Sequence, residues 1–241
     1  MLDRQQFEQQ LAQVEARVTS ACTRSGRSRE EVQVMAVTKY VSLETTRLVL
    51  EQGHAHIGES RWQDASQKWE QLHQLGTWHF IGHLQSNKVK DVLGRFDYIH
   101  SLDRLSLAKA IHKKATQDQQ RVKCFLQVNV SGEASKHGME PEQLISMAES
   151  VREMPSIEIV GLMTMAPYTE HPEETRPVFR ALRQLRDELN QRSILPNPVQ
   201  HLSMGMSNDF DIAVEEGATF IRLGSVLVGK DEGGETNGSH E

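Results

Sequence analysis

The sequence predicts a single (β/α)8 barrel preceded by one additional helix. Its 241 residues are close to the ~250 residues that a closed barrel of this kind needs. Short apolar runs alternate with amphipathic, helix-like patterns along the chain, which is typical of a parallel sheet covered by helices. Hydrophobic residues make up 37% of the chain, and this share argues against a largely disordered polypeptide.

The additional helix is predicted at the N-terminus, over residues 3–23. Leu11, Val14 and Val18 follow the i, i+3, i+7 spacing of one helical face there. Eight apolar runs of strand length come after it. These predicted strands span residues 32–38, 55–58, 78–82, 96–100, 122–130, 157–163, 201–204 and 219–223.

Helical patterns separate the predicted strands, and several carry recognisable start and stop residues. The first of them has Ser42 as a candidate N-cap and Gly53 just beyond its end. Pro141 and Pro172 stand where the first turn of a helix tolerates proline. These predicted helices span residues 43–51, 63–74, 86–93, 104–119, 141–153, 172–192 and 208–216.

An open, doubly wound sheet is the alternative architecture for such alternation. Its usual G-x-G-x-x-G fingerprint follows none of the predicted strands, so we favour the barrel. No linker interrupts residues 1–229, which we assign to one barrel domain. Residues 230–241 are rich in Gly and Glu and lack core-forming side chains, and we predict a disordered tail there.

Charge and targeting signals narrow the possible classes of function. The net charge is −6, much of it in the last eleven residues, and no stripe of Lys and Arg stands out. DNA and RNA are therefore not expected as partners. Residues 1–17 are polar and contain no signal-peptide or membrane-anchor pattern, so we expect a cytoplasmic protein without membrane contact.

Neither the cysteines nor the histidines form a metal-binding motif. Cys22 and Cys124 have no C-x-x-C spacing, and we interpret them as buried thiols. His54 and His56 alternate as two ligands on one strand would, but no third ligand follows at a convincing spacing. We predict no metal site.

Lys39 is the most informative residue at the predicted strand ends, where the active sites of such barrels lie. It ends the apolar run MAVTK at residues 35–39. A lysine amine with little water around it is suited to capture a carbonyl group as a Schiff base. The alternative is a structural lysine whose stem covers apolar surface while its ammonium group stays in water.

The ends of the last two predicted strands are rich in small and hydroxyl-bearing residues. The seventh ends in SMGMS and the eighth in LGS. Barrels commonly bind phosphate after strands seven and eight, and a following helix offers free N–H groups. Ordinary turns are the alternative. We predict a phosphate cradle made of Ser203, Gly205, Ser207, Gly224 and Ser225.

Lys39 and this cradle together fit a phosphate ester that carries an aldehyde. Arg222, two residues before Gly224, is expected to point into the barrel mouth. Arginine only donates hydrogen bonds, so beside a pyridine nitrogen it would keep that nitrogen unprotonated. The alternative is an ion pair between Arg222 and a carboxylate such as Glu59.

Longer stretches of the chain resemble one family, the pyridoxal phosphate homeostasis proteins, which are related to the N-terminal barrel of alanine racemase. The matching stretches cover nearly the whole chain except the tail. They are AVTK at 36–39, WHFIGHLQSNK at 78–88, QVNVSGE at 127–133, GLMTM at 161–165, LSMGMSNDF at 202–210 and IRLGS at 221–225.

The resemblance implies bound pyridoxal 5′-phosphate and a barrel without the second, all-β domain of the racemases. It also implies a Schiff base at Lys39, contact with the pyridine side from Arg222, and phosphate contacts from residues of the predicted cradle. One departure is Ser60, where the family pattern has Asn, so an asparagine contact is shortened or lost. Lys136 lies on the same rim as Lys39 and is either a second cofactor contact or a solvated loop lysine.

Three functions compete on these residues. The first is a cofactor carrier that holds pyridoxal phosphate reversibly and delivers it to apoenzymes, as a monomer or weak dimer with no or weak catalysis. The second is an amino acid racemase or lyase, which needs an acid/base on both faces of the substrate; no partner opposite Lys39 is evident. The third, a phosphate-sugar aldolase, shares the lysine chemistry but not the sequence pattern. We expect the carrier.

Overall fold

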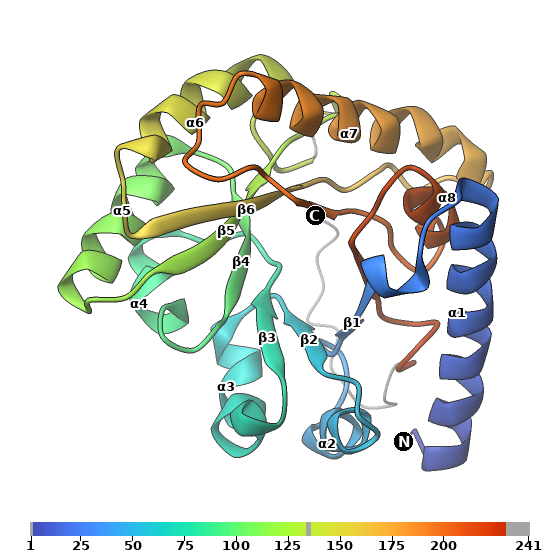
Figure 1. Cartoon of the computed structure of the whole chain (residues 1–241). Coiled ribbons are helices and arrows are strands. Elements are labelled where there is room, and N and C mark those ends of the chain that lie inside the picture. Colours follow the sequence, from blue (N-terminus) through green and yellow to red (C-terminus); the bar gives the residue numbers. More distant parts are fainter. Residues whose placement is uncertain (1, 134–135, 230–241) are drawn as a thin grey trace.

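Eight parallel strands close into a barrel in the order β1 to β8, so the predicted fold class is confirmed (Figure 1). This computed structural model describes residues 2–133 and 136–229; the predicted tail, 230–241, lies outside them. The strands are β1 Gln33–Val37, β2 His56–Glu59, β3 Thr77–Phe80, β4 Tyr98–Leu102, β5 Val122–Gln127, β6 Ile157–Met163, β7 His201–Ser203 and β8 Phe220–Leu223.

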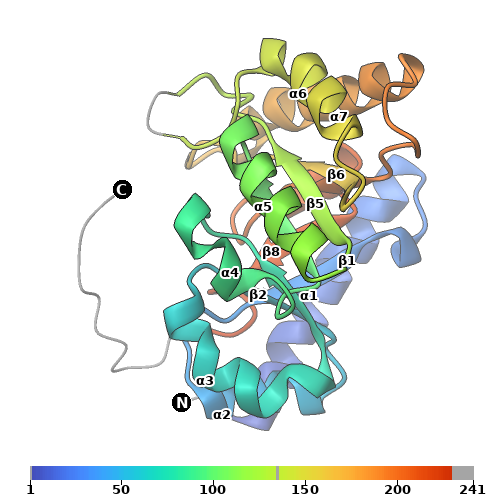
Figure 2. The same ribbon diagram turned by 90° about the vertical axis from the view of Figure 1, so that its left-hand side faces the viewer.

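The helices surround the strands, and two views at right angles show them on the outside of the barrel (Figures 1 and 2). The α-helices are α1 Arg4–Ser25, α2 Leu43–Glu51, α3 Trp62–Leu72, α4 Val89–Val92, α5 Leu105–Gln117, α6 Leu144–Arg152, α7 Arg176–Gln191 and α8 Phe210–Glu215. Short 3₁₀ turns are η1 Arg29–Glu31, η2 His73–Leu75, η3 Ser86–Lys88, η4 Pro141–Gln143 and η5 Pro172–Thr175. None of the helices formed by the described residues is long and apolar enough to cross a membrane.

The predicted elements are all present, and the differences lie at their ends. Three predicted helices begin with a 3₁₀ turn, and two of these turns start at Pro141 and Pro172, which cannot donate an N–H. The strand predicted to end at residue 130 stops at Gln127. The Val128 N–H still donates to the Met163 carbonyl of β6, but the next N–H, of Asn129, donates to the Met139 carbonyl in the returning loop.

The additional helix α1 packs against α8 on the outside of the barrel, and Figure 1 shows the two side by side. It begins at a capping box, in which Asp3 accepts from the Gln6 N–H and Gln6 accepts from the Asp3 N–H. Phe7, Val14 and Val18 on its inner face are buried. The apolar face predicted from sequence therefore extends one turn further toward the N-terminus, to Phe7.

Large side chains fill the barrel interior. Met35, Phe125, Met163 and Phe220 form a buried cluster there. Gly58 makes room for this cluster, because a Cβ at that position would lie 2.7 Å from the Met35 sulfur. The barrel is thus a packed core rather than a channel, as expected for eight strands.

Candidate functional site

The carboxyl ends of β1 and β8 lie next to each other, which brings the predicted lysine and phosphate residues to one rim. Ala36 pairs with Leu223 in the parallel ladder, and a Cβ on Gly224 would lie 3.8 Å from the Val37 Cβ. Lys39 and Ser225 each follow these paired positions by a few residues. The closed topology therefore juxtaposes two segments that are far apart in the sequence.

Lys39 stands in the turn just after β1 and is half-buried. Its Nζ lies 4.8 Å from the centre of the Tyr40 ring. No ion pair joins Lys39 to any residue that the structure describes, so its amine is not committed to a carboxylate. A half-buried amine at a strand end is accessible to a small carbonyl compound.

A buried ion pair supports the backbone directly beneath Lys39. Glu59, at the end of β2, is fully buried and accepts hydrogen bonds from Lys68 Nζ at 3.0 Å and Thr38 Oγ1 at 2.6 Å. Lys68 Nζ also donates to the Thr38 carbonyl at 2.6 Å. Burial raises the pKa of Glu59, and Lys68 opposes this shift. Glu59 is therefore the partner of Lys68, and the alternative pairing with Arg222 is not formed.

Arg222 lies inside the barrel mouth and is 4% exposed. Its NH1 donates to Ser203 Oγ at 2.7 Å and its NH2 to the Thr164 carbonyl at 2.9 Å. Burial lowers the pKa of Arg222 to about 10, while nearby Asp209 opposes the shift. The guanidinium thus stays charged at neutral pH, and two fixed acceptors set its orientation.

Ser203 is fully buried, and its hydroxyl links Arg222 to His100, whose Nδ1 lies 2.9 Å from Ser203 Oγ. The sequence grouped Ser203 with Ser207 in one phosphate cradle. The two serines differ in burial, since Ser207 is half-buried in the turn that follows β7. This geometry favours Ser203 as a support for Arg222.

The turn after β8 offers free backbone donors. A single helical turn follows β8, in which Leu227 N and Val228 N both donate to the Gly224 carbonyl. Ser225 N and Val226 N donate to none of the described residues. Free N–H groups at the start of a helical turn are suited to bind an anion.

Gly205 has a structural reason for its place in the turn after β7. Its φ is +91°, and a Cβ would lie 2.5 Å from the Ala213 Cβ of α8. Its carbonyl accepts the Arg222 N–H at 3.0 Å. Gly205 therefore lets α8 approach the strand and fixes the backbone beside Arg222.

Helix α8 begins at Phe210, two residues later than predicted, because Asp209 first closes a turn by accepting the Met206 N–H at 2.6 Å.

Two further residues noted in the sequence follow β2 and β5: Ser60, which departs from the family pattern, and Lys136, a candidate second cofactor contact. Ser60 is half-buried just after β2. Lys136 is half-buried in the loop after β5, where its N–H donates to the Glu133 carbonyl at 3.0 Å. Within the described parts of the chain, no three or more His, Cys, Asp or Glu side chains gather as a metal site would require.

Sequence reasoning missed several residues that the fold brings to Arg222. The Thr164 carbonyl and the ring of His100 lie around the guanidinium and its serine partner. The sequence did not point to Val226 either, because its contribution is a main-chain N–H, which almost every residue type has. For His100, the inward positions of the strands would have been a usable signal, since alternate residues of a barrel strand face the interior.

Comparison with known proteins places this barrel in a family. The family model for the alanine racemase N-terminal domain matches residues 9–232. The pyridoxal phosphate homeostasis protein of Aquifex aeolicus is 44% identical over 223 residues, which cover 92% of this chain and 97% of the relative.

Solved structures agree with both matches. PipY of Synechococcus elongatus, solved with PLP bound, has a TM-score of 0.77 at 34% identity and covers 90% of this chain and 100% of its own. An alanine racemase of Clostridium difficile shares the fold alone, with a TM-score of 0.69 at 12% identity over 92% of this chain and 56% of the racemase. The chain belongs to the pyridoxal phosphate homeostasis protein family, within the alanine racemase N-terminal domain fold.

Proposed function

We propose that this chain binds pyridoxal 5′-phosphate reversibly on Lys39 and acts as a cofactor carrier rather than as an enzyme. The observation that carries this proposal is the arrangement of three groups at one end of the barrel. An uncommitted lysine amine follows β1, free N–H donors follow the adjacent β8, and a buried arginine stands on β8 itself. Residues 1–229 would form the cofactor-binding unit.

The residues present fit each part of the cofactor. The N–H groups of Ser225 and Val226 after β8, and the Ser207 hydroxyl after β7, would supply neutral donors for a phosphate dianion. Arg222 supplies only donors toward a ring nitrogen and keeps it unprotonated. The Lys39 amine would hold the cofactor's aldehyde carbon as a Schiff base, formed with loss of water and reversed by hydrolysis.

The carrier assignment draws support from what surrounds Lys39. Racemisation needs a second acid/base on the face opposite the lysine, and tyrosine is one group of suitable chemistry. The ring of Tyr98 stacks on His79 inside the barrel, and Tyr168 is 81% exposed. Tyr40 packs beside the Lys39 ammonium itself, on the same turn. An unprotonated ring nitrogen also withdraws electrons weakly, which disfavours turnover.

Chemical labelling tests the covalent site. The protein is incubated with pyridoxal 5′-phosphate, reduced with borohydride and digested, and the modified peptide is mapped by mass spectrometry. The pyridoxyl group is expected on Lys39. Lys39→Arg is expected to abolish the visible absorption of the complex, whereas Lys136→Arg should retain it. A label on another lysine, with Lys39 unmodified, would contradict the assignment.

Two activity measurements separate a carrier from an enzyme. The loaded protein is expected to restore activity to a cofactor-free pyridoxal-phosphate enzyme when the two are mixed. Racemase and decarboxylase assays on the common amino acids are expected to stay at background. Saturable turnover of any amino acid that is lost in Lys39→Arg would support the racemase or lyase alternative and overturn the carrier proposal.

A further inference from the structure

Four side chains form a continuous line of hydrogen bonds through the barrel to Arg222. His56 Nδ1 lies 3.0 Å from His79 Nε2, and His79 Nδ1 lies 2.9 Å from His100 Nε2. His100 Nδ1 is 2.9 Å from Ser203 Oγ, which accepts from Arg222 NH1 at 2.7 Å. The five residues come from β2, β3, β4, β7 and β8, so the line crosses the interior.

The two central rings are held rigidly. His79 stacks on Tyr98 with an interplanar angle of 5°, and His100 stacks on Phe125 with an angle of 15°. Both histidines are fully buried, and burial holds the pKa of each well below its usual value. Each ring is therefore neutral and carries one proton, so each has one donor nitrogen and one acceptor nitrogen.

Arg222 determines which atom donates and which accepts in each of these hydrogen bonds. Arginine only donates, so Ser203 Oγ must accept from Arg222. The remaining partner of that hydroxyl among the described residues is His100 Nδ1. A serine that accepted from both sides would leave its own proton buried without an acceptor, which is costly. Ser203 therefore donates to His100 Nδ1.

The direction then propagates along the line, because each ring has a single proton. His100 carries its proton on Nε2 and donates to His79 Nδ1. His79 likewise carries its proton on Nε2 and donates to His56 Nδ1. All bonds thus point away from Arg222, and bonds aligned in series polarise and strengthen one another.

The line ends where the barrel is open to solvent on the side opposite Lys39. His56 is half-buried and lines a cavity of about 420 Å³ at the N-terminal ends of the first strands. Glu15, Arg29 and His54 line the same cavity. The Nε2 proton that the direction assigns to His56 therefore has water or polar side chains as possible acceptors there.

We propose that His56, His79, His100 and Ser203 form a one-directional relay that holds the Arg222 guanidinium in position and orders its contact with a bound cofactor ring. The four are positioning residues, since they act through Arg222. The proposal rests on the function proposed above for Arg222, but the tautomers that it requires belong to the protein alone. They are measurable without any cofactor.

The first experiment measures those tautomers in the cofactor-free protein. Two-bond proton–nitrogen correlation spectra of histidine-labelled protein distinguish a protonated Nε2 from a protonated Nδ1. His79 and His100 are both expected as the Nε2-protonated tautomer. A protonated Nδ1 on either ring would overturn the relay, and a failure of Lys39 labelling would leave this result untouched.

Variants then test whether the residues act as one unit. Ser203→Ala removes the donor to His100, so the tautomers of His100 and His79 are expected to change together, although Ser203 does not contact His79. His201→Asn is the matched control, because His201 packs on the same interior ring of Phe220 but lies outside the line. An unchanged His79 in Ser203→Ala would contradict the proposal. The wild-type spectrum still decides the case if that variant does not fold.

A spectral titration with pyridoxal 5′-phosphate connects the relay to the cofactor site. Ser203→Ala is expected to weaken binding about tenfold, the effect of losing one bond to a charged group, and to shift the absorption maximum of the complex. Ser203→Thr, which keeps the hydroxyl, should restore the wild-type maximum. His201→Asn should bind as the wild type does. Equal losses in Ser203→Ala and His201→Asn would assign Ser203 a role in packing only.

Discussion

At the scale of single residues, the surroundings of a side chain decide its role more than its place in a motif. Ser203 and Ser207 belong to one five-residue segment, yet Ser203 is fully buried against Arg222 while Ser207 is half-buried in a turn. Ser203 ends β7, whereas Ser207 lies in the following turn, beyond the left-handed Gly205 with its φ of +91°. We therefore propose the Ser207 hydroxyl, rather than that of Ser203, as the phosphate contact.

Replacing Ser207 by Ala should therefore weaken binding of the phosphorylated cofactor selectively. One lost hydrogen bond to a charged group corresponds to about 1.5–3 kcal/mol, so the dissociation constant of pyridoxal 5′-phosphate should rise by about ten- to hundredfold. Binding of unphosphorylated pyridoxal should hardly change. Fluorescence titrations with both ligands measure the two constants. A similar loss for both ligands would place Ser207 away from the phosphate.

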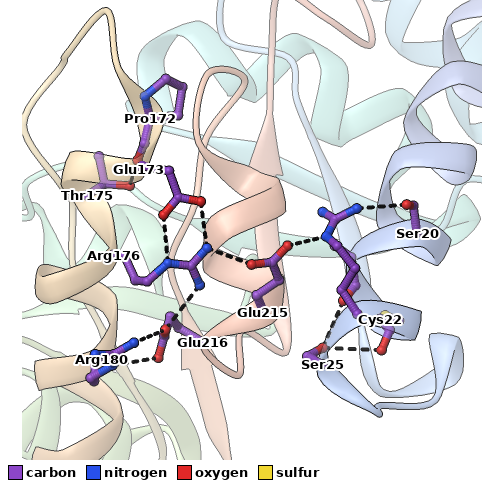
Figure 3. Close-up of polar contacts among 12 residues, drawn as sticks. Ser20, Cys22, Ser25, Pro172, Glu173, Thr175, Arg176, Arg180, Glu215 and Glu216 are labelled. Carbon is purple, nitrogen blue, oxygen red and sulfur yellow. Dashed lines mark hydrogen bonds and ion pairs between the residues drawn. The ribbon is translucent and has the colours of Figure 1, made fainter.

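At the scale of elements, one arginine joins three helical segments on the outside of the barrel. Arg176 at the start of α7 bonds Glu173 at 2.7 Å, Glu215 of α8 at 2.6 Å and Glu216 at 3.2 Å. Glu215 also bonds Arg24 of α1 at 2.6 Å. Figure 3 shows Glu215 between Arg176 and the helix that carries Ser20. The network therefore fastens the additional helix to the barrel.

Glu216 is the carboxylate whose loss should matter most in this network. Its side chain is 5% exposed and pairs with Arg176, Arg180 and Arg183. Glu216→Gln removes the negative charge that Arg180 and Arg183 face and one of the three carboxylate partners of Arg176. The substitution should lower the free energy of unfolding by about 1–3 kcal/mol. The exposed pair of Glu153 supplies a control, and Glu153→Gln should cost less than about 1 kcal/mol. Urea unfolding compares them, and equal costs would contradict the buried network.

Gly205 tests the close approach of α8 to the strand end. Gly205→Ala combines a positive φ with a clash at Ala213, and should destabilise the fold by more than the ~1–2 kcal/mol of a left-handed alanine. Gly26→Ala is the matched control, because its φ is also positive but no atom lies within 4 Å of the added Cβ. Thermal unfolding of the two variants separates the clash from the backbone strain. A smaller loss in Gly205→Ala than in Gly26→Ala would contradict the packing.

At the scale of the whole molecule, burial of neutral histidines makes the fold sensitive to acid. Burial lowers the pKa of His56, His79, His100 and His201, and lowers that of His54 from 6.5 to about 4. The unfolded chain then binds more protons than the folded one below pH 6.5, so stability falls as the pH falls. Burial raises the pKa of Glu59 and of Asp209, so these two carboxyl groups make the folded state more stable as the pH falls. They are outnumbered by the five histidines.

The free energy of unfolding should therefore be greatest above about pH 6.5 and should decrease toward pH 4. Each titrating histidine contributes a slope of up to about 1.4 kcal/mol per pH unit within its window. His54→Asn should reduce the total slope between pH 6.5 and 4 by nearly one proton. Urea unfolding at a series of pH values measures this slope. An identical slope in wild type and variant would show that His54 does not titrate on unfolding.

The barrel itself was predictable from local patterns. Strand and helix periodicities, the Ser42 cap and the prolines at helix starts all act over a few residues, so they are visible in the sequence. Family resemblance likewise pointed to Lys39 as the cofactor lysine, which remains a prediction until the label is mapped. Element ends were less accessible, because the hydrogen-bond partner that ends a strand, such as Met139 for Asn129, comes from elsewhere in the chain.

The site depended on closure of the barrel. The pairing of Glu59 with Lys68 rather than with Arg222, and the contact of Ser203 with Arg222, follow from which strand ends become neighbours in space. The hydrogen-bonded line from His56 to Arg222 joins residues up to 166 positions apart, taken from five strands. The sequence of one strand shows which of its side chains face inward. It does not show which side chains of other strands they contact, because those partners are determined only when the eight strands close into a barrel.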